Sequence, residues 1–239
     1  MSLNLVHCNQ IRNTKQVSFG SKNHPIEPFV IKTKKGPLFV EELSENDIPK
    51  AAKFEMDFYE KEFPIWGVST KNKSKAEIKR FLSYLAIRQK SVLSNKEGNG
   101  TVLVAKNFWG QVKALFQVEH FCALQSFMGK DEKTAHVETC FIDGKYRSQG
   151  IGKILFEKLL ETTKGRFTDI YLEAENKAVS FYKRAGFEPL DTSNPALKKI
   201  SDCVLTHRPD RDEITLMSKT LDPANPWWKR VAKQLEHIK

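Results

Sequence analysis

The stretch that decides the fold of this chain reads Tyr146-Arg147-Ser148-Gln149-Gly150-Ile151-Gly152-Lys153-Ile154-Leu155. It joins a predicted strand, 134–142, to a predicted helix whose apolar residues recur at helical spacing. Its two glycines stand where the helix begins, so backbone N–H groups of the first helical turn can approach an anion. The helix dipole and Arg147 add positive charge there. The stretch therefore predicts a pyrophosphate-binding loop.

The spacing of the glycines separates this loop from two other phosphate loops. A Rossmann fingerprint needs Gly-x-Gly-x-x-Gly, and a Walker loop needs a Gly-Lys-Ser/Thr run; neither occurs here. Two glycines alone can also serve only to let a helix pack closely on a sheet. Arg-x-x-Gly-x-Gly between a strand and an amphipathic helix resembles the acetyl-CoA loop of the GNAT superfamily of N-acetyltransferases. The resemblance implies that acetyl-CoA is bound by Arg147, Ser148, Gln149, Gly150, Ile151 and Gly152.

A second motif supports this resemblance. A predicted strand, 167–174, is followed by a short predicted helix, 176–187, which Gly186 closes. The helix resembles the family's Ala-x-x-Phe-Tyr-x-x-x-Gly-Phe signature. The resemblance implies that Tyr182 points at the acetyl-CoA sulfur and protonates the departing thiolate; a core tyrosine is the alternative. The family's asparagine falls at Glu175 here, so Asn176, one place later, is the candidate pantetheine contact.

The order of the predicted elements fits the same family. A strand at 37–43 precedes two helices, at 44–63 and 75–93, and three strands, near 102–105, 114–122 and 136–142. After the two motifs, 187–190 and 213–221 are candidates for the last strands, and the long stretch 191–212 is expected to form a lid or a short helix. The resemblance implies an α/β (α+β) GNAT fold, a mixed central sheet of about six to seven strands with helices on both faces.

The two ends of the chain differ from this middle part. Residues 1–35 carry six basic side chains against Glu27, a net +5 of the total +10, and lack periodicity. They predict a flexible basic tail, with an organellar transit peptide as the alternative. Residues 36–222 form the predicted acetyltransferase domain. Residues 223–239 predict an amphipathic helix that packs on this domain or, alternatively, binds a membrane surface or a partner.

Composition limits the class of protein. No apolar run reaches the ~18 residues of a membrane span, and no secretory signal is visible, so a cytoplasmic protein is expected. Cys8, Cys122, Cys140 and Cys203 form no Cys-x-x-Cys pair, which predicts free thiols and no metal site. Because half of the net charge lies in the tail, nucleic-acid binding is not expected. A homodimer is a possible assembly.

Acetyl transfer needs a base, because a protonated amine cannot attack a thioester. In the strand before the loop, simple alternation places His136, Glu138, Cys140 and Ile142 on one face. The family uses both of the first two positions for general bases, so Glu138 is the first candidate and His136 the second. The alternative for either residue is an ordinary cross-strand pair. Backbone groups of Cys140, Phe141 and Ile142 are expected to pair with the pantetheine amides.

The acceptor is less well defined. The family resemblance frames its cleft by segments 63–69 and 191–212, near which Asp57, Glu60 and Glu62 could attract a cationic amine. The predicted function is transfer of an acetyl group from acetyl-CoA to a primary amine of a small molecule by direct attack. Alternatives are a protein N-terminus or lysine as the acceptor, and a non-catalytic acyl-CoA-binding module.

Overall fold

The computed structural model describes residues 26–63, 70–71, 73–94, 100–119, 134–206 and 208–221. Within them, eight strands form one mixed sheet in the order β1-β2-β3-β4-β5-β6-β8-β7. All neighbouring strands are antiparallel except β5 and β6. The strands are β1 (Phe29–Ile31), β2 (Leu38–Glu42), β3 (Gly100–Lys106), β4 (Val112–Glu119), β5 (Thr134–Ile142), β6 (Asp169–Glu175), β7 (Glu188–Pro189) and β8 (Ile214–Thr220).

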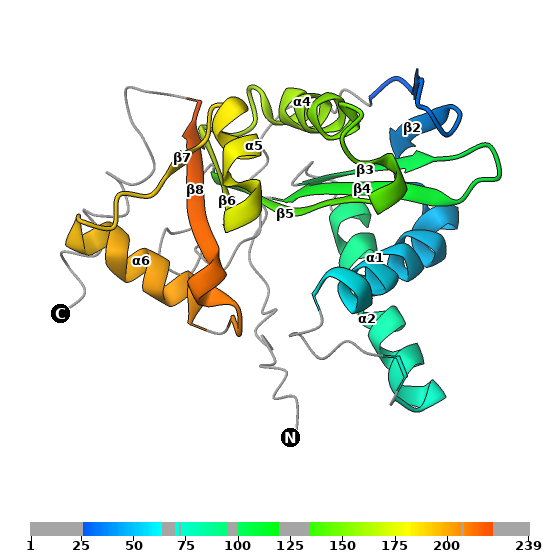
Figure 1. Cartoon of the computed structure of the whole chain (residues 1–239), viewed down its shortest axis with the longest axis horizontal. Coiled ribbons are helices and arrows are strands. Elements are labelled where there is room, and N and C mark those ends of the chain that lie inside the picture. The colour runs from blue at the N-terminus through cyan, green and yellow to red at the C-terminus, as the bar shows by residue number, and fades with distance from the viewer. Residues whose placement is uncertain are drawn as a thin grey trace.

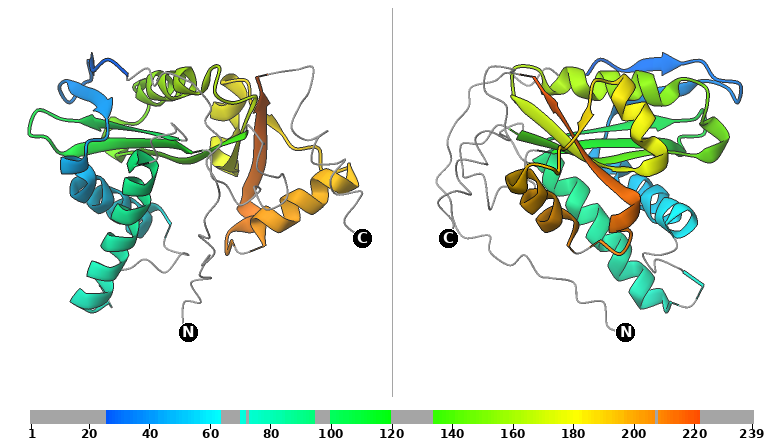
Figure 2. Two further views of the ribbon diagram at one scale, coloured as in Figure 1. Left: turned by 180° about the vertical axis from the view of Figure 1, so that it is seen from behind. Right: turned by 60° about the vertical axis from the view of Figure 1, so that its left-hand side comes forward.

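Helices cover both faces of this sheet (Figure 1). Helices α4 and α5 lie on one face, and α1 and α2 lie on the other. Helix α6 lies at the β7–β8 end of the sheet, as Figure 2 shows. The α-helices are α1 (Ile48–Glu62), α2 (Lys75–Ser94), α4 (Ile151–Thr163), α5 (Val179–Arg184) and α6 (Pro195–Leu205), and short 3-10 turns span Glu45–Asp47, Gly144–Tyr146, Asn176–Ala178 and Arg211–Glu213.

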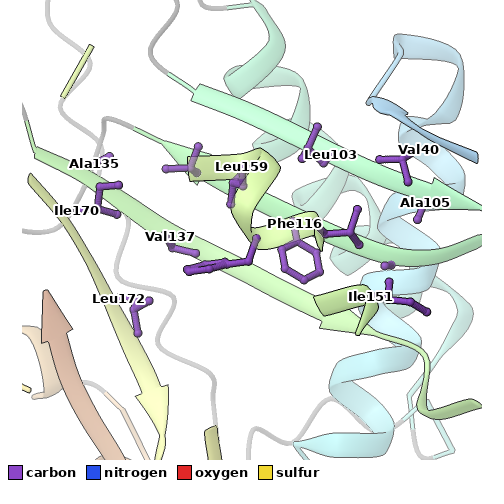
Figure 3. Close-up of a cluster of buried hydrophobic side chains, with 14 of the residues drawn as sticks. Val40, Leu103, Ala105, Phe116, Ala135, Val137, Ile151, Leu159, Ile170 and Leu172 are labelled. Carbon is purple, nitrogen blue, oxygen red and sulfur yellow. The ribbon is translucent and has the colours of Figure 1, made fainter. Parts of the chain in front are cut away.

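The larger core lies between α4 and the sheet (Figure 3). Ile151, Leu155 and Leu159 stand four residues apart on α4, so they share one face of the helix and pack against strand residues such as Phe116 and Val137. All of these side chains are at most 5% exposed. Burying one such side chain contributes about 1.5–3 kcal/mol to stability. This core fixes the start of α4, and therefore the glycine loop, against the end of β5.

The sheet is larger than the sequence indicated. It has eight strands, whereas six to seven were expected. The added strand, β1, lies within residues 1–35, so the predicted tail is wrong for its last part. Strand β1 pairs with β2 through backbone groups along only three residues, too few to show an apolar period. The expected helix or lid in 191–212 contains α6. Residues 1–25, 120–122 and 222–239 lie outside the described part of the chain.

A bulge in β5 changes the face to which its residues point. Val118 pairs with Val137 and Gln117 with Thr139, so Glu138 is an extra residue without a counterpart in β4. Before the bulge, Val137 packs on the α4 side; after it, Cys140 and Ile142 do. The prediction that His136, Glu138, Cys140 and Ile142 share one face is therefore wrong, because a bulge shifts the alternation by one residue. His136 and Glu138 lie on the face of α1 and α2.

Strands β5 and β6 separate soon after they begin to pair. Their parallel pairing covers Thr134 to His136 opposite Asp169 to Tyr171, although both strands continue beyond it. The β6-facing edge of β5 from Val137 to Ile142 is therefore not paired with β6. Among the described residues, no helix combines the length and apolar character that crossing a membrane requires.

Candidate active site

A cavity of about 1170 Å³ opens where β5 and β6 separate. We call one side of it the loop end, formed by residues 140–142 and by the lining residues of the glycine loop and α5. We call the other side the network end, formed by Arg88, Glu138, Glu173 and Arg208. Aromatic side chains from α1 and α2 also line the cavity: Phe58, Tyr59, Phe63, Phe81 and Tyr84.

At the loop end, the backbone of the glycine loop turns back on itself. Ser148 has a φ of 60° and Gly150 a φ of 77°, both in the left-handed region. A Cβ atom on Gly150 would meet nothing within 4 Å, so the glycine is needed for its backbone conformation rather than for space. The first N–H groups of α4 follow directly and have no partner within the helix. This end of the cavity therefore presents backbone N–H donors at the start of α4.

Gly152 has a different role from Gly150. A Cβ atom there would lie 3.2 Å from Ile142 Cδ1 and 3.6 Å from Phe181 Cε2. Gly152 therefore lets α4 approach β5 and α5 closely. A larger side chain at this position would disturb packing as well as any ligand.

Arg147 lines the cavity, and its exposed guanidinium is held by other groups of the protein. It donates to both carboxylate oxygens of Glu62 at 3.1 and 3.2 Å, and its Nε donates to the Ile142 carbonyl at 3.0 Å. It also lies 5.4 Å from the centre of the Phe58 ring. Arg147 thus links the glycine loop to the end of α1, and its positive charge is partly neutralised by Glu62.

Three predicted ligand residues do not line the cavity. Gln149 accepts a hydrogen bond from the backbone N–H of Lys34, and so joins the loop to the β1–β2 turn. Ile151 is buried in the core. Asn176 is exposed, and its side-chain oxygen accepts from the Thr215 hydroxyl at 2.9 Å. Ser148, Gly150, Gly152, Cys140, Phe141, Ile142 and Tyr182 do line the cavity, as predicted.

Tyr182 lines the loop end of the cavity from α5. Its ring packs on Phe156 and Phe181, with centroids 5.4 and 5.1 Å away. Its hydroxyl and the thiol of Cys140 are hydrogen-bonded to each other. Burial, followed by Cys140, raises the pKa of Tyr182 well above its ordinary value, and burial raises that of Cys140 to about 12. Both groups are therefore protonated at neutral pH, and the phenol has a proton to donate to a sulfur atom.

The residues of the network end belong to a longer row of alternating charges. This row crosses the sheet from α1 to the chain after α6. Arg88 donates to Glu55 and, at 2.5 Å, to Glu138. His136 lies 3.1 Å from Glu138 and 3.5 Å from Glu173. Arg208 continues the row, 3.3 Å from Glu173 and 3.0 Å from Asp210. We refer to these residues as the charge row: Glu55, Arg88, Glu138, His136, Glu173, Arg208 and Asp210.

The charge row alters the protonation of both predicted bases. Burial alone would raise the pKa of Glu138, but Arg88 and His136 outweigh it and lower that pKa to about 2. Burial alone would lower the pKa of His136, but Glu173 and Glu138 raise it well above its usual value. At neutral pH, Glu138 is ionised and a weak base, and His136 already carries its proton. Neither residue alone has a pKa close enough to 7 to act as an efficient general base at neutral pH.

A third carboxylate, Glu119, lies beside these two residues. It ends β4 and stands opposite His136 in the sheet. Oxygen and nitrogen atoms of Glu119, His136 and Glu138 lie within 4.8 Å of one another. Burial, followed by the charge of Glu138, raises the pKa of Glu119 to about 7. No motif or periodicity had identified this residue as a candidate.

The cluster of Glu119, His136 and Glu138 has the atom types of a cation site. However, the pKa of His136 is raised, so a proton occupies the imidazole nitrogen that a metal would need, and Arg88 is bound to Glu138. A metal ion bound here would have to displace this proton and the Arg88 contact. The cluster adjoins the charge row through His136 and Glu138.

Apart from His136 and Glu138, the members of the charge row were not predicted from the sequence either. One signal was available for Glu55, because it falls on the apolar stripe of α1, three and four residues after Ala52 and Ala51. Glu173 likewise interrupts a buried strand between Leu172 and Ala174. Arg208 carried no such signal. Of the acidic residues expected near the acceptor, Glu62 lines the cavity, whereas Glu60 accepts from Thr70 and Asp57 pairs with Lys53.

Comparison with known families fits this geometry. A family model described as an acetyltransferase (GNAT) domain matches residues 114–199, which include β5, the glycine loop and Tyr182. Residues 114–199 are thus similar to a GNAT acetyltransferase domain. The chain is 17% identical to an acetyltransferase of the GNAT family from Staphylococcus aureus Mu50, with a TM-score of 0.51 over 77% of this chain and 99% of that one. It is 14% identical to the GNAT domain of S. lividans PAT, with a TM-score of 0.50 over 81% and 97%.

Two curated proteins resemble shorter parts of this chain. A peptidyl-lysine N-acetyltransferase of Salmonella typhimurium is 43% identical over 53 residues, which are 22% of this chain and 36% of that protein. A probable N-acetyltransferase of Drosophila melanogaster is 32% identical over 76 residues, 30% and 41% of the two chains. The chain therefore spans less than half the length of these relatives.

Proposed function

We propose that this protein transfers the acetyl group of acetyl-CoA to a primary amine of a small molecule, by direct attack of the amine on the thioester. The observation that carries the proposal is the continuous cavity. Its lining includes the glycine loop and Tyr182 at the loop end and the charged residues of the network end. In this arrangement the pyrophosphate lies at the start of α4, the pantetheine follows the free edge of β5, and the thioester lies near Tyr182.

The groups around Tyr182 favour direct attack. Tyr182 supplies a proton for the departing thiolate of CoA. The Cys140 thiol lies next to it, but with a pKa of about 12 it is almost entirely unionised at neutral pH and so is a poor nucleophile. A covalent acyl-cysteine is therefore not part of the proposed reaction.

The network end supports a cationic acceptor with an apolar body. Glu138 and Glu173 are the carboxylates of the charge row that line the cavity, and their side chains are 23% and 16% exposed. Phe81 and Tyr84 stack on each other beside them, with ring centroids 6.4 Å apart. An ammonium group is attracted both by carboxylates and by aromatic faces. We therefore expect amines carried on aromatic or long apolar groups to be preferred.

A screen of acceptors tests this function. CoA thiol release is measured with polyamines, aminoglycosides, arylalkylamines, amino acids and lysine peptides, against a blank without acceptor. We expect small amines to be acetylated, and Glu138→Gln to lower kcat/KM about a hundredfold. Glu161→Gln, on the exposed side of α4, serves as the control and should leave the rate unchanged.

A protein lysine or N-terminus is the second candidate acceptor, favoured by the activity named for the Salmonella relative. It predicts that peptides in the same screen react faster than every small amine. Tight acetyl-CoA binding without turnover on any acceptor would instead indicate the non-catalytic module.

A further inference from the structure

Glu119 and Glu138 form a pair of carboxylates that the sequence separates and the fold brings together. Glu119 is the last residue of β4, and its register partner on β5 is His136. Glu138 lies two residues after His136 on the same face of β5, and atoms of all three side chains lie within 4.8 Å of one another. The bulge affects the residues after Glu138, because it puts Cys140 and Ile142 on the opposite, α4-facing side.

The surroundings of the two carboxylates differ in charge. Glu138 accepts from the Arg88 guanidinium at 2.5 Å and faces the His136 ring nitrogen at 3.1 Å. Glu119 accepts from the neutral amide of Gln117, on its own strand, at 3.1 Å. Its partner on β3 is Gly100, which brings no charge. Among the described residues, the charged groups that act on Glu119 are His136 and Glu138 from β5 and Arg88 from α2.

We propose that Glu119 takes up the proton that the acceptor amine loses before it attacks the thioester, and that this proton passes through Glu138. The inference rests on the proposed acetyl transfer. Glu138 lines the cavity and can touch the amine, whereas Glu119 lies behind it and acts through it. When two neighbouring carboxylates have different surroundings, their pKa values differ. The carboxylate with fewer positive neighbours has the higher pKa and holds the proton.

The proton steps balance over one turnover. An N–H bond of the ammonium breaks, and its proton passes to Glu138 and then to Glu119, across a gap of at most 4.8 Å that one water molecule can bridge. The free amine forms a C–N bond with the thioester carbonyl carbon. When the C–S bond breaks, Tyr182 protonates the thiolate, and the second proton of the nitrogen restores Tyr182. Glu119 finally releases its proton to water.

This path sets the pH dependence of the rate. Glu119 must be ionised to accept a proton, and its pKa in the folded protein is about 7. The rate should therefore rise as the pH rises through about 7 and fall below it. Glu138, with a pKa of about 2, and His136, whose pKa is raised, keep one charge state across this range.

The test is the pH–rate profile of Glu119→Gln. We expect kcat/KM at pH 8 to fall about ten- to a hundredfold and the acidic limb near pH 7 to disappear, while acetyl-CoA affinity measured by calorimetry stays the same. Glu119→Asp keeps a carboxylate and should retain the acidic limb of the pH–rate profile. If Glu119→Gln folds poorly, this limb in Glu119→Asp is the test. Glu161→Gln is the control for loss of a carboxylate elsewhere.

Carboxyl NMR titration of the wild-type protein gives a second measurement that needs no acceptor. A carboxyl signal should titrate near pH 7 and be absent in Glu119→Gln. Normal turnover with an unchanged acidic limb in Glu119→Gln would overturn the inference but leave the proposed function intact. A wild-type protein that binds acetyl-CoA and acetylates no amine would remove the proposed function and this inference together.

Discussion

The loop end and the network end of the cavity are built in opposite ways. The loop end comes from one short continuous segment, and its ligand groups are largely backbone N–H groups whose direction follows from Ser148 and Gly150. The network end collects side chains from α2, β5, β6 and the chain after α6. Local chain geometry therefore sets the first site, and the sheet topology sets the second.

This difference indicates where substitutions can change the specificity of the protein. Backbone N–H groups are present with almost any side chain, so the loop end tolerates substitution as long as the left-handed conformations remain. At the network end each charge depends on its neighbours, because removing one member leaves a buried partner uncompensated. The loop end is thus robust to substitution, and the network end is sensitive to single changes.

The largest effect is expected at Tyr182, the proposed proton donor at the loop end. Tyr182→Phe removes the proton donor but keeps the ring that packs on Phe156. Turnover should fall about ten- to a thousandfold with little change in acetyl-CoA affinity, because general-acid help acts mainly in the transition state. Steady-state kinetics together with calorimetry check both parts. Wild-type turnover in the variant would make the tyrosine structural.

A smaller effect is expected for a charge placed at the loop end. Gly150→Asp should weaken acetyl-CoA binding about ten- to a hundredfold, because a carboxylate repels the pyrophosphate where the backbone binds it. Gly150→Ala is the matched control, since it introduces the same strain at a φ of 77° without charge. The comparison uses dissociation constants from calorimetry. Equal affinity of the two variants would exclude this loop as the phosphate site.

The smallest effect concerns the link between Glu62 and Arg147. Glu62→Gln removes the charge that partly neutralises Arg147 and should strengthen acetyl-CoA binding at most about fivefold, in line with about 0.2–1 kcal/mol for a partly exposed ion pair. Glu60→Gln, on the same helix but bound to Thr70, is the control. If affinity falls in Glu62→Gln, the role of Glu62 is to hold the loop in place.

Much of the loop end could be predicted from the sequence because its determinants are neighbours in the chain. The strand, the glycine loop, α4 and the Tyr182 motif are confirmed as elements, and most of the named residues line the cavity. The exceptions, Gln149 and Asn176, contact Lys34 and Thr215, which are distant in the sequence. Whether these residues bind the cofactor stays a prediction.

The network end could not be predicted in the same way. The partners Arg88 and Glu138 are fifty residues apart, and only the sheet brings them together. The bulge at Glu138 depends on the register between β4 and β5, which the strand's own residues do not reveal. Strand β1 was missed because its three residues show no period. In each case the deciding contact joins segments far apart in the chain.

The bulge in β5 also limits how this protein can change in length during evolution. Deleting one residue there would turn His136 and Glu138 toward α4 or force Cys140 and Ile142 away from it, since a strand shifted by one residue reverses every side chain beyond the shift. Substitutions within β5 alter one side chain each, whereas an insertion or deletion would separate the proton-handling residues from the tyrosine–thiol pair. The spacing between Glu138 and Cys140 should therefore resist insertions and deletions more strongly than the identity of the residue between them resists substitution.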